Sequence, residues 1–106
     1  MFIYKRCVCK VRPHDKIDLA EFNPVAEQMK LLSAPSRIAM LSLLYKAPHC
    51  VCDLETHTGL SQTLLSHHLK DLADGGLIES SKERTFVEYR LTGKGRKLIK
   101  IIKQIK

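Results

Sequence analysis

Four cysteines stand out in the 106-residue chain because they form two identical triplets, Cys7-Val8-Cys9 and Cys50-Val51-Cys52. Paired thiolates bind soft metal or metalloid ions and can also be oxidised to a disulfide. Soft ions take three or four sulfur ligands. We therefore expect the four cysteines to surround Cd, Pb or Zn, or three of them to hold As(III) or Sb(III).

The backbone around Cys50 and Cys52 decides whether both sulfurs can reach one ion. Side chains two apart in a regular helix diverge by about 200°, which opposes chelation. We predict a helix over residues 51–58, so Cys50 comes before its first turn and both sulfurs can turn to one ion. The exposed amides at a helix start also favour the thiolate, which is the ligating form.

Cys7 and Cys9 belong to an N-terminal arm, residues 1–16, for which we predict extended structure. Alternate residues of an extended chain point to the same side, so this pair can present both sulfurs together. His14 and His49 are alternative ligands. A single cysteine is most often a small buried hydrophobe. Two identical triplets in so short a chain favour metal binding for both pairs.

Helical and strand periodicities predict one winged helix-turn-helix domain over residues 17–106, mainly α with a β-hairpin wing. The expected elements are a helix from Pro24 with Asn23 as its cap, helices over 36–47, 51–58 and 61–74, strands over 77–81 and 85–91, and a helix from Gly95. A polar segment, 82–84, connects the strands. The last helix carries an apolar stripe that a second copy of the chain could cover: Leu98, Ile101, Ile102 and Ile105.

The helix over 61–74 is the expected DNA-reading element, because the second helix of this motif enters the major groove. Short hydrogen-bonding groups and one cation occupy its start and outer face: Ser61, Gln62, Thr63, Ser66, His67 and Lys70. Gln62 can pair bidentately with adenine. Adjacent histidines on a helix point about 100° apart. We therefore expect His67 to face DNA and His68 to pack inward.

The hairpin supplies two further cations for DNA. Lys82 and Arg84 lie at its expected tip, where they can reach the minor groove or its phosphates. The chain as a whole carries 18 Lys and Arg against 11 Asp and Glu, a net charge of +7. Such a balance suits double-stranded DNA, although a solvated basic surface has the same composition.

Other classes of protein are less consistent with the sequence. The N-terminal apolar run is too short for a signal peptide, and no stretch approaches the length of a membrane span. We expect a cytoplasmic protein with reduced thiols and no membrane partner. No nucleophile, base and orienting group come together in the pattern, and His49 and Cys50 are neighbours only in sequence. An enzyme acting on a small organic substrate is therefore not expected.

Four segments resemble the ArsR/SmtB family of metal-responsive repressors: LLSAPSRIAMLSLL, CVCDL, GLSQTLLSHHLKDLADGGLI and YRLTGKGRKL. The resemblance implies a homodimer, paired through its first and last helices, that leaves its inverted-repeat operator when an effector binds. Cadmium- and lead-sensing members use arm cysteines together with CVCDL, and arsenic sensors use CVCDL. Cys50 and Cys52 match that motif directly. Cys7 and Cys9 match in kind, at a different spacing.

The family has a second type of sensing site, with acidic and histidine ligands on the last helix. Residues 93–106 contain no Asp, Glu or His, so the resemblance implies that this site is absent here. The expected effector is therefore a soft ion: Cd, Pb, Zn or As(III).

Three hypotheses follow from these patterns. The first is a repressor released from operator DNA when a soft ion binds the cysteine thiolates. The second is a repressor of the same fold that senses oxidants or persulfides through its thiols. The third is a metal-buffering or interaction module that does not bind DNA.

Overall fold

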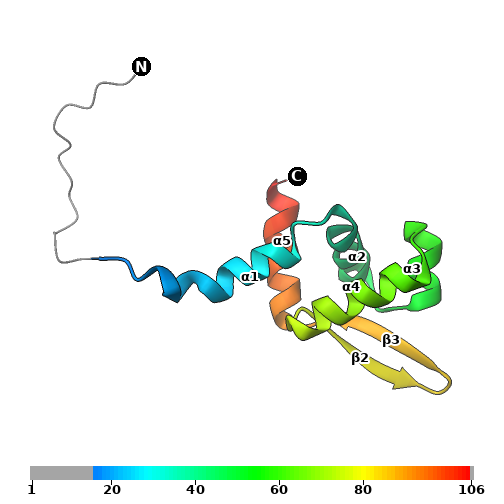
Figure 1. The fold of residues 1–106 in the computed structure, drawn as a ribbon. Coiled ribbons are helices and arrows are strands. Elements are labelled where there is room, and N and C mark those ends of the chain that lie inside the picture. Colours follow the sequence, from blue (N-terminus) through cyan, green and yellow to red (C-terminus); the bar gives the residue numbers. More distant parts are fainter. Residues whose placement is uncertain (1–15, 106) are drawn as a thin grey trace.

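A computed structural model describes residues 16–105 and confirms a mainly α winged helix-turn-helix (Figure 1). A 3-10 helix, η1, opens the described chain, and a three-stranded antiparallel sheet of order β1-β3-β2 forms the wing. The elements are η1 (Leu19–Phe22), α1 (Asn23–Leu31), α2 (Pro35–Lys46), β1 (His49–Cys50), α3 (Val51–Thr58), α4 (Gln62–Asp74), β2 (Ile78–Glu83), β3 (Phe86–Leu91) and α5 (Gly93–Ile105).

The first helix starts as predicted, but its cap differs. Asn23 is the first residue of α1, and Phe22 holds the cap position without a side-chain hydrogen bond. The reason is η1, which runs directly into α1. Asp18 caps that 3-10 turn by accepting the Ala20 N–H at 3.1 Å. The segment therefore needs no polar cap at Asn23.

The helix-turn-helix has the predicted bounds. Helix α3 ends at Gly59, whose φ of 73° lies in the left-handed region that glycine adopts without strain. Ser61 Oγ then caps α4 by accepting the Leu64 N–H at 3.2 Å. The inner face of α4 contributes Leu65, Leu69 and Leu72 to the core, as its apolar spacing predicts.

The core lies between α2, α3, α4, the sheet and α5. Its fully buried members include Met40, Leu41 and Leu44 of α2 and Leu54 of α3. On α5 the buried apolar residue is Ile99, outside the predicted stripe. Leu98 and Ile102 of the stripe pack partly against the core, whereas Ile101 and Ile105 are exposed. The predicted apolar stripe of α5 therefore has two parts, one packed against the core and one exposed on the single chain.

The wing differs from prediction in two details. Lys82 and Glu83 belong to β2, so the connection is the two-residue turn Arg84-Thr85. Strand β1 was not expected from the sequence, because two residues are too few to show alternation. It pairs with β3 through His49 opposite Tyr89 and Cys50 opposite Glu88.

Helix α5 begins at Gly93, two residues before the expected Gly95. Gly95 is instead a contact point. A Cβ there would overlap the Leu77 carbonyl oxygen, so α5 can lie against the start of the wing only with glycine at this position.

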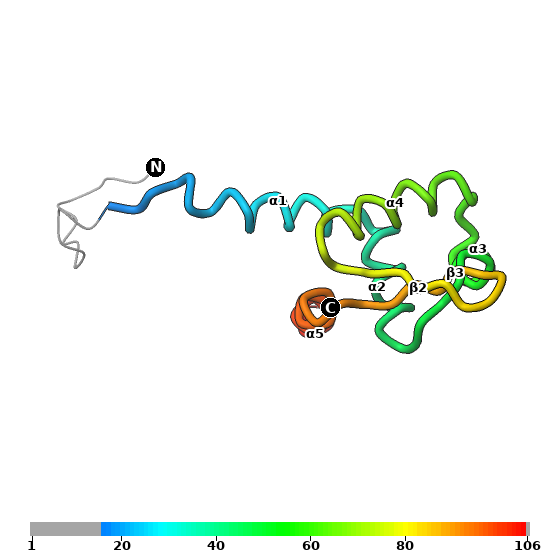
Figure 2. The backbone as a smooth tube through the Cα atoms, turned by 90° about the horizontal axis from the view of Figure 1, so that it is seen from below, coloured from blue at the N-terminus to red at the C-terminus, as the bar shows by residue number. Residues whose placement is uncertain are grey.

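Helix α1 projects away from the rest of the chain (Figures 1 and 2). It is anchored at its C-terminal end, where Gln28 Nε2 donates to the Gly75 carbonyl oxygen at 3.1 Å and Leu32 is buried. Most of its apolar side chains, including Val25 and Met29, are exposed. None of the helices within residues 16–105 is both long and apolar enough to cross a membrane.

Candidate functional site

The central cysteine triplet lies at the point where strand β1 turns into helix α3. Cys50 has an extended backbone, φ −88° and ψ 170°, and holds the cap position of α3. Cys52 follows in the first helical turn. Cys50 is half-buried and Cys52 is exposed. The sequence predicts this change from extended to helical backbone. Because it falls within the triplet, the two sulfurs are not held at the divergent angle of a regular helix.

Cys50 also belongs to the wing. Its backbone pairs with Glu88 of β3, the strand that continues to the tip of the hairpin. Helix α3, for which Cys50 holds the N-cap position, packs against α4. Cys50 is therefore connected to both elements that are predicted to contact DNA, to α4 through α3 and to the hairpin through β3.

The described residues supply only part of a metal site. Within residues 16–105, no three His, Cys, Asp or Glu side chains lie close enough together to hold an ion. His49 stands next to Cys50, its Nδ1 lies 2.6 Å from the Ala47 oxygen, and its ring is 5.7 Å from that of His57. Cys7, Cys9 and His14 lie outside the described residues. Two thiols suit a soft ion but require further donors to complete its coordination.

Five of the predicted DNA-reading residues line one shallow groove on the outer face of α4, with a volume of about 440 Å³: Gln62, Thr63, Ser66, His67 and Lys70. We call this set the reading face. All five side chains are exposed. Lys70 Nζ also lies 3.1 Å from Asp74 Oδ2, an ion pair that DNA phosphates would compete for. Ser61 caps the helix and stands at the start of this face.

The two adjacent histidines separate as predicted. His67 is exposed on the reading face, and His68 is 7% exposed on the opposite side of α4. His68 contacts Ser36 and Arg37 of α2, partners that the sequence analysis missed. The sequence contained one indication of such partners. Position 68 falls on the buried face of the helix together with Leu65, Leu69 and Leu72, where a polar side chain needs hydrogen-bond partners.

Burial lowers the pKa of the His68 imidazole. The Arg37 guanidinium and His67 lower it further, while Asp71 raises it. A neutral ring is therefore favoured inside the fold. This sets His68 apart from the polar side chains of the reading face, which are solvated.

The wing tip carries Arg84 in a strained conformation. Its φ is 56°, and no other non-glycine residue within 16–105 has a positive φ. Glycine, asparagine or aspartate usually occupies such a turn position, and an arginine there costs about 1 kcal/mol. Lys82 is exposed nearby on β2. A cation held at such a cost is consistent with the predicted contact to DNA.

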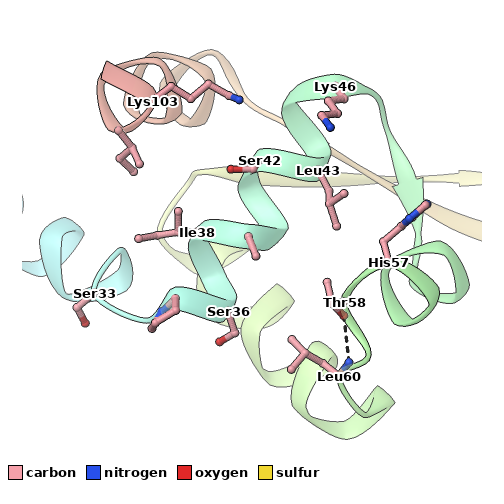
Figure 3. Close-up of a pocket in the computed structure, with 13 residues that line it drawn as sticks. Ser33, Ser36, Ile38, Ser42, Leu43, Lys46, His57, Thr58, Leu60 and Lys103 are labelled. Atoms are coloured by element: carbon pink, nitrogen blue, oxygen red, sulfur yellow. Dashed lines mark hydrogen bonds between the residues drawn. The ribbon is translucent and has the colours of Figure 1, made fainter. Parts of the chain in front are cut away.

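A hollow of about 720 Å³ lies along α2, between the end of α3 and the end of α5 (Figure 3). Ile38, Leu43 and Ile102 give it apolar walls, and Lys46 and Lys103 stand beside it. None of the predicted site residues lines it. The hollow, like α1, leaves apolar side chains partly uncovered in the single chain.

Comparison with known proteins agrees with this architecture. The family model described as the bacterial regulatory protein, arsR family, matches residues 34–80. An arsenical resistance operon repressor of Staphylococcus xylosus is 43% identical over 63 residues, covering 59% of this chain and 61% of that protein. The chain thus spans about three fifths of the length of that relative.

Two solved structures match over most of their length. The transcriptional repressor BigR from Xylella fastidiosa has a TM-score of 0.73 and 31% identity, covering 81% of this chain and 86% of that chain. A homodimeric winged helix-turn-helix domain from Mycobacterium bovis has a TM-score of 0.74 and 29% identity. The match covers 87% of this chain and 88% of that chain. These relatives are regulators rather than enzymes. The chain belongs to the ArsR family of bacterial regulatory proteins.

Proposed function

We propose that the protein is a transcriptional repressor that binds operator DNA as a homodimer and leaves it when a soft metal or metalloid ion binds its cysteine thiolates. One observation carries the proposal. Cys50 and Cys52 open α3, and α3 leads through a tight turn to the helix that bears the reading face. The expected ions are Cd, Pb, Zn and As(III). The similarity to an arsenical resistance repressor supports this class of effector.

DNA binding is supported by two surfaces on neighbouring elements. The reading face offers Gln62 for base contacts and short hydroxyl side chains for phosphates. Lys82 and Arg84 on the wing add cations for the flanking backbone. The net charge of +7 favours a polyanion independently of its sequence.

The homodimer is supported by apolar side chains that the single chain leaves exposed on its first and last helices. On and before α1 and on α5 these are Ile17, Leu19, Phe22, Val25, Met29, Ile101 and Ile105. A small domain seldom exposes so many large apolar groups without a partner. The similar winged helix-turn-helix domain from Mycobacterium bovis is homodimeric. A second copy that covers α1 and α5 would bury them.

The proposed switch acts through Cys50. An ion held by Cys50, Cys52 and the arm cysteines Cys7 and Cys9 pulls on the start of α3 and on the paired strand β3. That pull shifts the dimer toward a shape whose reading helices do not match successive grooves. By thermodynamic linkage, ion and DNA weaken each other's binding by the same factor.

An operator titration tests the switch. A labelled duplex from the promoter region of the protein's own gene is titrated with and without saturating Cd, Pb or arsenite. We expect the ion to weaken binding. Identical affinity in both conditions would overturn the metal switch. Thiolate-to-metal ultraviolet absorption, compared between the wild type and the Cys7→Ser/Cys9→Ser variant, gives ion preference and sulfur number.

A thiol redox or persulfide sensor is the second candidate. The exposure of Cys52, together with the lack of a third donor among residues 16–105, favours it over a complete preformed metal site. Mass spectrometry after mild oxidant or persulfide treatment, set beside metal stoichiometry, separates the two. A protein that binds no promoter DNA at low salt would instead be a metal-buffering or interaction module.

A further inference from the structure

We propose that His68 is a positioning residue for DNA binding. With its partners on α2 it forms a clamp that holds the reading helix, and a proton on its ring opens that clamp. This proposal rests on the proposed DNA-binding function. The clamp consists of Ser36 and Arg37 at the start of α2 and of His68 and Asp71 on α4.

The position of His68 is unusual for a polar residue. It is 7% exposed, between Leu65, Leu69 and Leu72 on the inner face of α4. No other polar residue within 16–105 is classed as buried. A buried imidazole must satisfy its ring nitrogens with hydrogen bonds, so its two partners fix its orientation.

The hydrogen bonds define the protonation state of the ring. Arg37 Nε–H donates to His68 Nδ1 at 3.1 Å, so Nδ1 is the acceptor. The single proton of a neutral ring is then on Nε2, which donates to Ser36 Oγ at 2.8 Å. Ser36 lies in the first turn of α2 (Figure 3). Both ring nitrogens of His68 are therefore bound to α2.

Arg37 extends the clamp to two further elements. Its Nη2 donates to Asp71 Oδ2 at 2.7 Å, one turn along α4, and its Nη1 lies 3.5 Å from the Leu31 oxygen at the end of α1. The Arg37 side chain is 20% exposed. A charged pair that is partly removed from water is costly to break on one side only. The clamp thus joins α1, α2 and α4.

A second proton on His68 has no place in this arrangement. Protonated Nδ1 cannot accept from Arg37, so that hydrogen bond is lost and two cations meet in a buried site. The charged or titratable groups facing the ring are Arg37 from α2 and Asp71 and His67 from α4. Only Asp71 favours a protonated ring, and its carboxylate is already engaged by Arg37.

The consequence for DNA follows from the geometry of one helix. Gln62, Thr63 and Ser66 stand on the outer face of α4, and His68 and Asp71 hold its inner face. Recognition requires side chains to be held within about 0.5 Å of their productive positions. An opened clamp lets the helix shift, so operator affinity falls as the solution is acidified.

This pH dependence has the opposite sign to that of an exposed histidine. A protonated imidazole on a surface that contacts DNA would add a cation near the phosphates and strengthen binding in acid. Protonation of His68 weakens it. The direction of the pH dependence, and its loss in a His68 variant, therefore distinguish a buried positioning histidine from a surface histidine that contacts DNA.

The experiment measures operator affinity by fluorescence anisotropy at pH 7.5 and about 5.5, at constant ionic strength, with the promoter duplex described above. We expect the wild type to bind operator several-fold more weakly at pH 5.5 than at 7.5, because the proton and the DNA act on the same helix and are thermodynamically linked. His68→Gln should bind equally at both pH values, because a neutral amide cannot take the second proton. The control His57→Asn, at an exposed position of α3, should retain the wild-type profile.

A wild-type acid loss that persists unchanged in His68→Gln overturns the proposal. Nuclear magnetic resonance of the wild type tests the clamp without any variant. The His68 ring should be neutral with its proton on Nε2 at pH 7.5, and α4 amides should exchange faster at pH 5.5 than intrinsic rates predict. An Nδ1-protonated ring, or unchanged α4 protection, contradicts the clamp. If no DNA binds at any pH, the proposed function fails while this second measurement still tests the clamp.

Discussion

The start of α3 and the outer face of α4 are the two chemically distinctive regions of this protein, and they are built differently. The reading face is complete within one helix, since five side chains at helical spacing share one groove. The start of α3 supplies only part of the cysteine site, because residues 16–105 provide two thiols and no group of three donors. A surface that reads DNA can be local, whereas a site that encloses an ion needs donors from distant parts of the chain or from a second copy.

The largest expected effect tests whether the cysteine site controls the reading face. Cys50→Ser/Cys52→Ser should abolish the response to Cd, Pb or arsenite while leaving operator affinity without ion unchanged. The wild type should lose about fivefold to 150-fold in affinity with ion, the usual range of allosteric coupling. Anisotropy titrations with and without ion measure both. A variant that still responds would place the sensor elsewhere.

The next effect tests whether both regions depend on a dimer. Val25→Glu/Met29→Glu places charges on exposed apolar positions of α1, and we expect a monomer that binds operator roughly a hundredfold more weakly, through loss of two-site binding. The control Asn23→Glu adds a charge on the other side of α1, away from this apolar stripe, and should remain a dimer. Sedimentation equilibrium and anisotropy give mass and affinity. A dimeric double variant with normal affinity would exclude α1 from the interface.

A smaller effect sharpens the role of the reading face. Gln62→Ala should cost about 1–3 kcal/mol against the preferred operator and much less against unrelated DNA, because a base contact carries the sequence information. Gln104→Ala, at an exposed position of α5, is the matched control and should change the affinity for neither duplex. Competition binding with operator and random duplexes measures the ratio of the two affinities. An equal loss on both duplexes would reassign Gln62 to a phosphate contact.

The smallest effect concerns the strained wing tip. Arg84→Gly should weaken all DNA binding a few-fold and reduce the salt slope by about one, as expected for one lost phosphate contact. It should also raise thermal stability slightly, since glycine adopts the observed φ of 56° without strain. Arg84→Lys keeps both charge and strain and should change neither property strongly. Melting and salt-dependent anisotropy separate strain from charge.

The stability of the fold should itself depend on pH through His68. The lowered pKa of the folded state means that the unfolded chain binds a proton more readily. Stability is therefore complete above the ordinary imidazole value near 6.5 and falls as the pH decreases from there toward the folded value. Chemical denaturation at pH 7.5 and about 5.5 should show the decrease in the wild type and a smaller one in His68→Gln.

The sequence by itself determined the elements whose signals are local. Gly59 and Ser61 mark the turn and cap of the helix-turn-helix, and the spacing of Leu65, Leu69 and Leu72 assigns the inner face of α4. That assignment also separates His67 from His68. The placement of Cys50 before the first helical turn followed in the same way, because each of these features depends on neighbours within a few residues.

Only the tertiary structure decided the contacts between distant segments. Strand β1 exists because His49 and Cys50 meet β3, and two residues carry no periodicity of their own. Ile99 is buried and Ile101 exposed because the sheet and α2 cover one side of α5. His68 finds Ser36 and Arg37 some thirty residues away, which no local pattern encodes. Long-range packing chose these partners, since it alone determines which polar groups are removed from water together.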